Sequence, residues 1–534
     1  MTLPDIKLPT TSLFVLWQLQ KNGYQAYLVG GSVRDLIAKG MGLNQQETEL
    51  KDFDFDLATN AVPEQILQIF PESFYENDFG TVSLTPENLL KIMRDGGWLV
   101  DDWQELQPTT AVRADRLDVQ HSTKLHESLA LPHFEAKMPP NLNFEITTYR
   151  VGEIYDETSR SPQKMSWGKD INEDLSRRDF TINALALTIT EEKLATFFAA
   201  KNLKKTITLT PNDYQLLDNY HGLEDLKAGL IRAIGEPRKR FCEDPLRLLR
   251  AVRFSVQLNF AIEDNTYQAI KEESGLLKTI SSERIRDEFL KMLASDYPRE
   301  AVMMLAETGL LAQFLPELLT MQDVAQSGHH LTDVWIHSLD SLAACPNPDP
   351  VVRLATLLHD VGKPETQRMA AGQYTFYNHQ VVGAHQAKRI AQRLKLPKAD
   401  VQRIFILVRY HMFYYQPENT DASIRRFMRQ VGLENLNDIL DVREADRLGS
   451  NARKTSWRLE EMKQRMIEQL HQPLQTRDLA IDGNDLMREF NLQPGPILGE
   501  ILHYLLELVI DDSNLNTAEI LMTKAKEFLA RKNI

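Results

Sequence analysis

Hydrophobic and polar positions follow two different periods in the two parts of the chain. Before about residue 190, strand-type apolar runs occur at Tyr24–Gly31, Phe79–Leu84 and Phe144–Arg150, and Lys51–Thr59 alternates acidic with apolar residues. Alternation with a period of two is typical of a strand with two different faces. A helical run follows the first strand directly. This part of the chain therefore predicts a mixed sheet with helices.

The strand pattern disappears from about Asp225 onward. Apolar residues then recur at i, i+3 and i+4, and Gly and Pro interrupt the runs, as at Pro346–Pro350. The expected fold class is α+β, a mixed-sheet head followed by an all-helical remainder. We predict four regions along the chain: a head over 1–190 with an insertion at about 86–143, a neck over 191–320, a third region over 321–455, and a helical tail over 456–534.

The composition places few limits beyond those of an ordinary globular protein, with 43% hydrophobic and 25% charged residues among 534. No run of about 18 apolar residues occurs, and the N-terminus lacks a basic start followed by an apolar core. We therefore expect neither a membrane span nor a signal peptide. Two cysteines, Cys242 and Cys345, provide neither a disulfide framework nor a thiolate metal cage. A cytoplasmic location is expected.

The net charge of −14 argues against nucleic-acid binding if the sum alone is considered. Its distribution changes this interpretation. Between Lys227 and Arg253 eight basic residues accompany three acidic ones, a local net charge of +5. An acidic protein can thus carry one basic surface for RNA, although a solvated helix face explains the same pattern.

Two glycines, Gly30 and Gly31, end a predicted strand and open a helix. In this geometry backbone N–H groups can approach a phosphate at the helix N-terminus, and Arg34 lies one turn into the helix. The structural alternative is a tight turn followed by a surface arginine. A pair of glycines alone does not separate the two interpretations.

Asp54 and Asp56 lie two residues apart on a predicted strand. Their side chains then point to the same side, roughly 6.5–7 Å apart along the chain. Two such carboxylates suit hard cations such as Mg²⁺, and Asp52 lies on the same face. An edge strand with outward charges is the structural alternative.

Four segments in this order resemble motifs of the class II tRNA nucleotidyltransferase and poly(A) polymerase family. They are Leu28–Asp35 (LVGGSVRD), Asp54–Thr59 (DFDLAT), Asp174–Ala186 (DLSRRDFTINALA) and Arg240–Phe254 (RFCEDPLRLLRAVRF). The resemblance implies a polymerase-beta-like nucleotidyltransferase head that uses two Mg²⁺ ions for phosphoryl transfer.

The resemblance also assigns roles to individual residues. It implies a nucleotide-binding set at Gly30, Gly31, Arg34, Arg177, Arg178 and Asp179, and Mg²⁺ ligands at Asp54 and Asp56. Glu145 is the candidate third carboxylate. The segment Val151–Asp174 corresponds to the flexible loop of CCA-adding members, and its length favours complete CCA addition.

The EDPLR segment, Glu243–Arg247, suggests how bases are selected. We expect this segment to be helical, so that Asp244 and Arg247, three residues apart, are neighbours on the helix surface. A carboxylate accepts from the amino group of C or A, and a guanidinium donates to the adjacent ring nitrogen; G and U present the reversed order. Arg250 and Arg253 follow at i+3 steps and are expected to reach nucleotide phosphates or RNA. An intrahelical ion pair is the structural alternative.

The helical part holds a second candidate site. His337, the adjacent pair His359 and Asp360, and Asp446 lie on separate apolar helical runs, an arrangement that suits a divalent transition metal. The set resembles the HD phosphohydrolase superfamily, so 321–455 is interpreted as an HD domain. His385 and His411 are spaced like its additional histidines. The implied substrates are 2′,3′-cyclic phosphates or phosphate-blocked RNA ends, whereas satisfied core histidines are the structural alternative.

The function most consistent with these patterns is addition of CCA to the 3′ end of tRNA, with CTP, ATP and tRNA as partners and end repair at the HD site. An A-adding enzyme or a poly(A) polymerase of the same family is the first alternative, since it shares the head and neck motifs. The HD segment and the lack of a basic C-terminal extension favour CCA addition. A non-catalytic RNA-binding protein predicts loss of the metal carboxylates, yet Asp54 and Asp56 are present. A role of the tail in holding tRNA follows from the resemblance alone.

Overall fold

The computed structural model of the protein describes most of the chain in two compact units, one ending at Glu273 and the other beginning at Ser274. The described residues are 3–43, 55–75, 80–100, 144–155, 162–168, 170–326, 332–370, 372–450, 452 and 456–532. The division at Glu273 falls inside the expected neck. The finer boundaries remain predictions. Among the described residues no helix combines the length and apolar character needed to cross a membrane.

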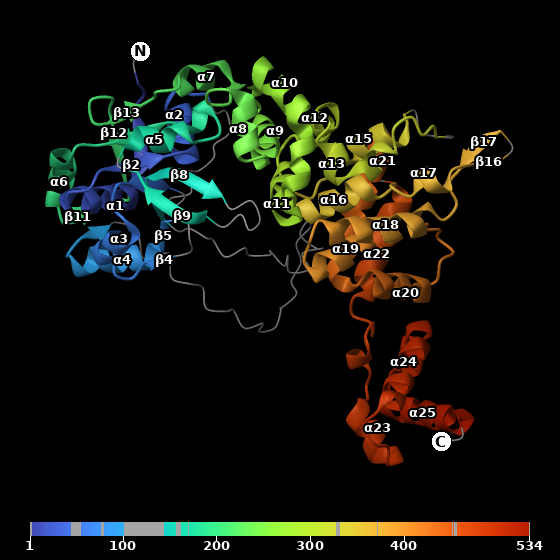
Figure 1. Cartoon of the computed structure of the whole chain (residues 1–534). Helices are drawn as coiled ribbons and strands as arrows, with labels where there is room; N and C mark the ends of the chain where they lie inside the picture. The colour runs from blue at the N-terminus through green and yellow to red at the C-terminus, as the bar shows by residue number, and fades with distance from the viewer. Residues whose placement is uncertain are drawn as a thin grey trace. The chain divides into compact units, whose positions relative to one another are not determined.

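A mixed sheet forms the centre of the first unit (Figure 1). Its strand order is β13 (Gln215–Leu217), β10 (Ala186–Thr188), β2 (Ala26–Val29), β3 (Asp56–Thr59), β7 (Phe144–Thr148), β5 (Thr81–Leu84) and β4 (Phe74–Tyr75). Neighbouring strands are antiparallel except β3 and β7, which run parallel. Because β3 is central, the residues at its start lie between two other strands. The expected α+β head is confirmed.

Helices and two-stranded sheets complete this unit. The helices are α1 (Thr10–Lys21), α2 (Gly31–Gly40), α3 (Pro63–Ile69), α4 (Pro86–Asp95), α5 (Ile171–Ser176), α6 (Glu191–Ala199), α7 (Gly222–Ala228), α8 (Pro237–Glu243), α9 (Leu246–Leu258) and α10 (Asp264–Glu273), with a 3₁₀ turn at Thr181–Asn183. The small sheets pair β1 (Ile6–Pro9) with β12 (Thr206–Leu209), β6 (Leu99–Val100) with β11 (Asn202–Leu203), β8 (Arg150–Tyr155) with β9 (Pro162–Trp167), and β14 (Leu230–Ile231) with β15 (Ala261–Ile262).

Two segments differ from the sequence-based expectations. The beginning of the expected insertion, 86–100, is part of the head, because α4 buries Leu89 and Met93 and β6 pairs with β11. The rest of the insertion, 101–143, lies outside the described residues. Within the expected flexible loop, β8 and β9 form an antiparallel pair. Strands also persist beyond Asp225, since β14 and β15 add a short parallel pair there.

The second unit is helical apart from the hairpin of β16 (Arg368–Ala370) and β17 (Gln373–Thr375). Its helices are α11 (Ser282–Leu293), α12 (Pro298–Glu307), α13 (Leu311–Phe314), α14 (Pro316–Leu319), α15 (Val334–Ala344), α16 (Pro350–Leu358), α17 (Lys363–Thr366), α18 (His379–Arg393), α19 (Lys398–Tyr410), α20 (Asp421–Val431), α21 (Leu436–Gly449), α22 (Trp457–Gln469), α23 (Gly483–Phe490), α24 (Pro496–Asp511) and α25 (Ala518–Lys532).

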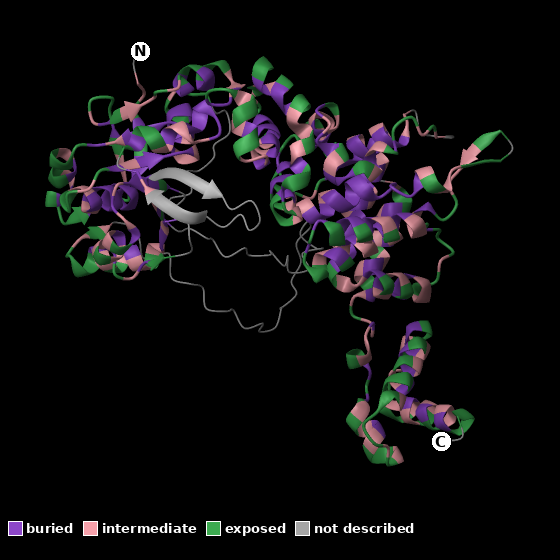
Figure 2. Cartoon of the chain, viewed as in Figure 1, coloured by how far each residue is buried: buried purple, intermediate pink, exposed green. Residues whose placement is uncertain are grey.

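Helix α16 shows why the centre of this unit is so strongly buried. Asp349 caps its N-terminus by accepting from the Val351 N–H at 2.8 Å, and Pro350 occupies the first helical position, where its missing N–H is not needed. All but two of its residues are buried, and α15 and α21 are buried over most of their length as well (Figure 2). The helix ends at Leu358, directly before His359 and Asp360.

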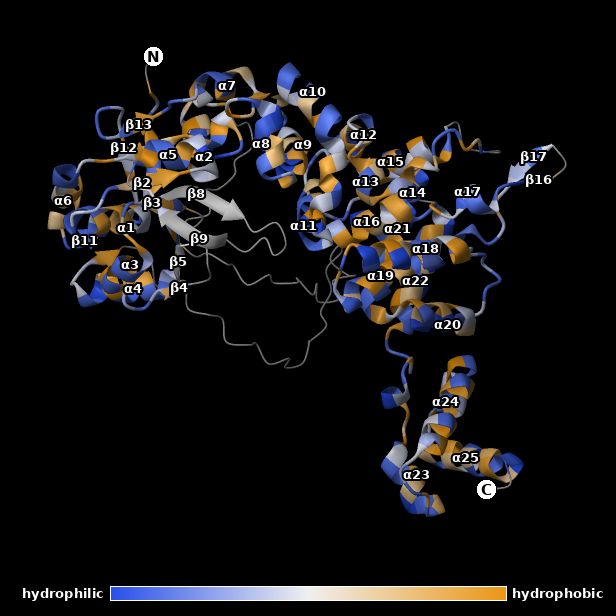
Figure 3. Cartoon of the chain, in the orientation of Figure 1, coloured by the Kyte–Doolittle hydropathy of each residue, from blue (hydrophilic) through white to orange (hydrophobic). Residues whose placement is uncertain are grey.

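The tail has a small core of its own. Apolar side chains of α23, α24 and α25 pack together around Leu486, Leu505 and Leu521, and hydrophobic and hydrophilic positions alternate along these helices (Figure 3). Arg425 of α20 is buried and donates to the Ile510 carbonyl at 2.8 and 2.9 Å. This contact satisfies a carbonyl in the last turn of α24.

The approach of α21 to α15 requires glycine at position 449. A Cβ atom there would lie 2.2 Å from Ser341 Oγ and 2.7 Å from its backbone nitrogen. We expect Gly449→Ala to lower the free energy of unfolding by about 1–3 kcal/mol, because overpacking forces the helices apart. Denaturant unfolding measures this. Gly499→Ala in α24 is the control, since a Cβ there meets nothing within 4 Å. Equal stability of the two variants would contradict the packing described.

Candidate functional site

The start of β3 brings together residues from three of the sequence motifs. Asp56 pairs in register with Val29 of β2 on one side and with Glu145 of β7 on the other. Both carboxylates are exposed, whereas Leu57 next to Asp56 is fully buried. Residues in register on adjacent strands point to the same face of a sheet. Asp56 and Glu145 therefore present two carboxylates side by side. Asp52 and Asp54 lie outside the described residues.

Gly30 lies beside the Asp56 carboxylate. It caps α2 with φ 80°, and a Cβ there would be 2.9 Å from Arg178 Nη1 and 3.5 Å from Asp56 Oδ2. Only glycine adopts this backbone without strain and leaves room for both groups. Gly31 is the first residue of α2. The helix N-terminus, a carboxylate and a guanidinium thus meet at one place, as a metal-bound triphosphate requires.

Buried polar contacts connect the head motifs to the neck helix. Arg34 Nη1 donates to Asn183 Oδ1 at 2.8 Å, and Asn183 Nδ2 donates to Asp179 Oδ1 at 3.2 Å. Arg250 Nε donates to Asp179 Oδ2 at 2.7 Å. Burial would raise the pKa of Asp179, but the Arg250 guanidinium, with hydrogen bonds from Asn183 and Phe180, lowers it. Asn183, which the sequence analysis did not single out, is the centre of this network.

The remaining head arginines are also held by the protein. Arg178 Nη2 donates to Asp174 Oδ2 at 3.1 Å. The Arg177 carbonyl accepts from Arg247 Nη2 at 2.8 Å, while Arg177 Nη1 is buried and forms no hydrogen bond with a described residue. A buried donor of this kind suits an anionic ligand. The nucleotide-contact roles of these arginines remain predictions.

The expectation that Asp244 and Arg247 share one helix is wrong. Asp244 lies between α8 and α9 in an extended conformation, with φ −144° and ψ 101°. Pro245 is the reason, because a residue before proline is driven out of the helical region. Asp244 Oδ1 accepts from the Leu246 N–H at 3.2 Å. Arg247 donates to Glu243 Oε2 at 2.8 Å.

Several cations of the expected basic surface are engaged within the fold. Arg238 pairs with Glu272, Arg240 donates to Glu243 Oε2 at 2.9 Å, and Arg250 pairs with Asp179. Arg253 lies over the Phe254 ring, 4.1 Å from its centroid. Lys239 is exposed. The positive field of this segment is therefore smaller than the local charge of +5 indicates.

In the second unit, the four predicted metal ligands come together, and His337, His359 and Asp360 lie close enough to share one ion. His337 Nε2 lies 3.2 Å from His359 Nε2, 3.2 Å from Asp446 Oδ1 and 3.5 Å from Asp360 Oδ2. His359 Nε2 lies 3.2 Å from Asp360 Oδ2 and 3.8 Å from Asp446 Oδ1. Metal–ligand bonds of about 2.1 Å in a tetrahedron give donor separations of about 3.4 Å. All four side chains are buried.

The histidines are oriented for metal binding by their second ring nitrogen. The Nδ1 atoms of His359, His379 and His411 lie 2.7–2.8 Å from the carbonyls of Thr356, Phe376 and Val408. A carbonyl only accepts, so Nδ1 carries the proton and Nε2 offers its lone pair. The Nε2 atoms of His379 and His411 are buried and form no hydrogen bond with any described residue. This donor set fits a divalent transition metal.

The electrostatics of the cluster favour the protonation states of metal ligands at Asp360 and His411, whereas Asp360 and Asp446 raise the pKa of His359 despite its burial. Burial opposes charge here, yet His359 and Lys363 hold the pKa of Asp360 well below its usual range. Burial and the neighbouring His359 lower the pKa of His411 to about 3. An ionised carboxylate beside a neutral imidazole is the combination that binds metal without displacing a proton.

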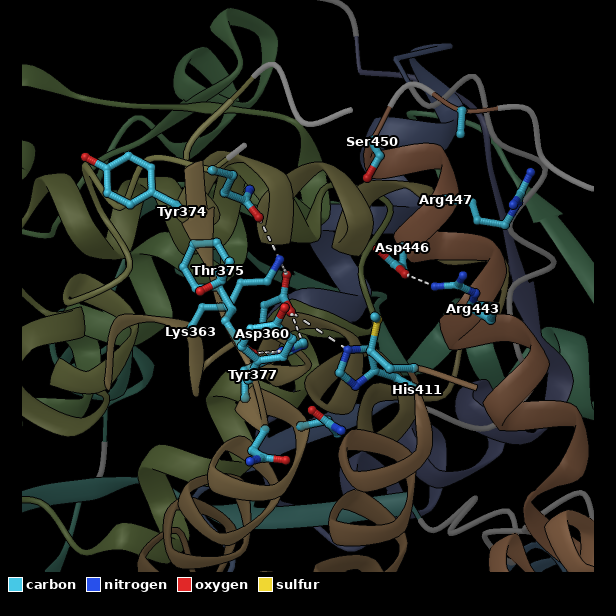
Figure 4. Close-up of a pocket in the computed structure, with 17 residues that line it drawn as sticks. Asp360, Lys363, Tyr374, Thr375, Tyr377, His411, Arg443, Asp446, Arg447 and Ser450 are labelled. Carbon is cyan, nitrogen blue, oxygen red and sulfur yellow. Dashed lines mark hydrogen bonds and ion pairs between the residues drawn. The ribbon is translucent and has the colours of Figure 1, made fainter. Parts of the chain in front are cut away.

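A cavity of 690 Å³ opens onto these ligands. Asp360, His411 and Asp446 are among the residues that line it, and Arg443, Asp446 and Arg447 come from α21, which Ser450 follows directly (Figure 4). Lys363 is buried, with Nζ 2.5 Å from Asp360 Oδ2 and 2.6 Å from Gln326 Oε1. The cavity therefore combines metal ligands with cations, as a phosphate ester requires.

One of the two additional histidines lies elsewhere. His411 is in the cluster, 3.8 Å from Asp360 Oδ1, but His385 packs against the Phe405 ring, 5.4 Å between centroids. The position expected for His385 is occupied by His379, whose Nε2 lies 3.3 Å from Asp360 Oδ1. His379 opens α18 and His385 is six residues further along the helix, so they face different sides. The spacing of the histidines along the sequence did not separate His379 from His385.

Comparisons with protein families match three parts of the chain. Residues 26–90 and 107–232 match a family described as "Poly A polymerase head domain". Residues 259–321 match "Probable RNA and SrmB- binding site of polymerase A". Residues 374–525 match "tRNA nucleotidyltransferase domain 2 putative".

Individual proteins show similarity over longer stretches. An A-adding tRNA nucleotidyltransferase of Deinococcus radiodurans is 34% identical over 353 residues, 63% of this chain and 75% of that protein. A CCA-adding enzyme of Ligilactobacillus salivarius is 27% identical over 531 residues, 98% of this chain and 97% of that protein. The crystal structure of the Bacillus stearothermophilus CCA-adding enzyme in complex with CTP shares the fold, with a TM-score of 0.59 at 24% identity over 98% of both chains.

Proposed function

Because this chain belongs to the class II tRNA nucleotidyltransferase and poly(A) polymerase family, we propose that it adds C, C and A from CTP and ATP to the 3′ end of tRNA without a nucleic-acid template. The observation that carries the proposal is the meeting of Gly30, Asp56, Glu145 and Arg178 at one end of the head sheet. The full-length similarity to a CCA-adding enzyme supports the choice of product.

In the proposed reaction the carboxylates hold the metal and the cations hold the triphosphate. Asp54 and Asp56 bind Mg²⁺, with Glu145 as the third carboxylate in register beside Asp56. Bound Mg²⁺ supplies activation of the tRNA 3′-hydroxyl and charge stabilisation on the leaving pyrophosphate. Gly30 lets the triphosphate approach the N-terminus of α2, and Arg178 lies 2.9 Å from where a Cβ of Gly30 would be. Arg34, Arg177 and Asp179 complete the nucleotide site.

Base selection is assigned to Asp244 and Arg247. Because Asp244 lies in the break before α9 and Arg247 in its first turn, both project from the start of that helix. Arg247 is oriented by Glu243 and by the carbonyls of Arg177 and Arg240. Arg250, through Asp179, ties α9 to the head motif. The head and the selecting residues are thus held by the same set of polar contacts.

We expect Arg247→Ala to lower incorporation of CTP and ATP by about 10- to 100-fold, with a smaller loss for UTP and GTP, because a positioned donor is removed. Single-nucleotide incorporation with each of the four triphosphates measures the ratio. Arg94→Ala, an exposed arginine in the last turn of α4, is the matched control. An equal loss for all four nucleotides would assign Arg247 to structure rather than to selection.

The HD cluster is proposed to hydrolyse 2′,3′-cyclic phosphates or terminal phosphates on RNA ends. His337, His359 and Asp360 would hold the metal, with Asp446 beside His337 as the fourth ligand, and His379 and His411 would bind a second ion or a phosphate. The bound metal supplies a nucleophilic water near neutral pH. Lys363 is placed to neutralise charge beside Asp360. Repair of a blocked end would precede extension by the head.

The A-adding relative favours a second candidate, addition of the terminal A alone. Two tRNA substrates separate the alternatives, one lacking all three terminal nucleotides and one lacking only A. CTP and ATP are supplied separately and together. A CCA-adding enzyme is expected to add two C residues to the first substrate when CTP is the only nucleotide supplied. Extension of only the second substrate identifies an A-adding enzyme, and long A tails identify a poly(A) polymerase.

Region boundaries and location complete the proposal. We assign 1–190 to the head, 191–320 to the neck, 321–455 to the HD domain and 456–534 to a tail that contacts tRNA. The separate apolar core of α23–α25 supports the tail as a folding element. Cys242 and Cys345 are both free thiols, which supports a reducing cytoplasm as the location.

A further inference from the structure

The metal-ligand cavity borders a second, smaller pocket. This pocket has a volume of 230 Å³ and is formed by the segment that follows His411 and by the beginning of α22. Arg443 and Arg447 line both hollows. The two arginines are one helical turn apart on α21 and therefore lie on one face of that helix. The same pair of cations thus forms the border between the two spaces.

Aromatic side chains dominate the second pocket. It is lined by Phe413, Tyr414, Tyr415 and Trp457, together with Arg443, Arg447 and Arg458. Tyr414 is 72% exposed and Trp457 61% exposed, although both are large and apolar. Arg458 lies over the Trp457 ring at 5.3 Å, and Arg443 lies 5.9 Å from the Phe413 ring. Exposed aromatic rings beside arginines are the combination on which nucleic-acid bases stack.

We propose that the second pocket binds the terminal base of a single-stranded RNA end whose phosphate lies in the HD cavity. This inference rests on the proposed HD site and adds the place where the terminal base of its RNA substrate binds. The base stacks on Trp457 and Tyr414. The sugar and phosphate pass Arg443 and Arg447 and reach the metal ligands.

Size and charge both fit this occupant. Drug-sized ligands fill pockets of about 300–1,000 Å³, so 230 Å³ suits one base with part of its sugar. The three arginines outnumber the carboxylate that faces them, Asp446, which Arg443 Nη1 contacts at 2.6 Å. A nucleotide fits this pocket because its flat base can stack on the aromatic rings and its anionic phosphate can pair with the arginines.

Equilibrium binding of uridine 3′-monophosphate to the full chain tests the inference. Uridine is chosen because the head is proposed to select C and A. Calorimetry without added metal avoids hydrolysis and makes the readout independent of activity. Inorganic phosphate is the second ligand, since it lacks the base. We expect Trp457→Ala to weaken nucleotide binding by about 5- to 100-fold, the loss of one stacked base, and to leave phosphate binding unchanged.

Matched variants separate stacking from general damage. Trp457→Phe is expected to restore most of the affinity because it keeps a ring, and Tyr297→Ala, an exposed aromatic outside both pockets, is expected to bind like the unaltered protein. Equal nucleotide affinity of Trp457→Ala and the unaltered protein, or an equal loss for inorganic phosphate, overturns the inference. Absence of cyclic-phosphate hydrolysis with intact, Trp457-dependent nucleotide binding would overturn only the proposed hydrolase function.

Discussion

Replacing Asp56 by asparagine is expected to reduce the rate of nucleotide addition to tRNA by about 10³-fold or more while the protein stays folded. Asp56 pairs in register with Val29 and Glu145, and its carboxylate lies beside Gly30 at the N-terminus of α2. Asparagine keeps the shape but removes the negative charge that holds Mg²⁺. The measurement is the single-turnover rate of ATP or CTP incorporation.

The control for this experiment is Asp95→Asn, an exposed residue at the end of α4. Both variants should unfold at temperatures within a few degrees of the unaltered protein, because Asp56 is exposed and does not contribute to the core. Addition by Asp56→Asn at more than about a tenth of the normal rate would mean that the catalytic centre lies elsewhere.

Asp360→Asn is expected to remove the metal of the second unit and with it any hydrolysis of RNA end phosphates, while nucleotide addition continues at the normal rate. Asp360 lies within 3.2–3.8 Å of His359, His379 and His411. Its carboxylate therefore belongs to two groups of metal ligands, one with His337 and His359 and one with His379 and His411. We expect metal affinity to fall by at least about 100-fold. Elemental analysis of the purified protein gives the metal content, and cyclic nucleotide hydrolysis gives the activity.

His385→Ala is the matched control because it removes a histidine of the same unit that packs against Phe405 instead of the cluster. It should keep its metal and its hydrolytic activity. Normal metal content in Asp360→Asn would show that the buried cluster is structural. Loss of tRNA extension in the same variant would show that the two sites do not act independently.

The local features of the head site were predictable because they depend on short-range geometry. A strand ending in Gly30 and Gly31 and leading into a helix follows from the apolar run and the two glycines. The exposed position of Asp56 follows from the alternation along its strand. The break in the helix before Pro245 was also predictable from the sequence, because proline drives the preceding residue out of the helical region. The prediction that Asp244 and Arg247 share a helix did not take this restriction into account.

Contacts between distant residues were not accessible in the same way. Arg250 and Asp179 are 71 residues apart, and neither periodicity nor charge spacing indicates that they pair. Asp56 and Glu145 are likewise neighbours only because β3 and β7 pair in parallel, and the periodicity of either strand does not indicate which strand will be its partner. His379 replaced His385 in the metal cluster because the start of α18, not its middle, faces Asp360.

The most direct test of the central proposal is the sequence of the product made on tRNA that lacks its three terminal nucleotides, with all four triphosphates present. We predict C, C and A in that order, no further extension, and neither U nor G. Because selection is assigned to protein side chains, the result should not change with the sequence of the tRNA end. Addition of A alone, of long A tails or of no nucleotide would contradict the account.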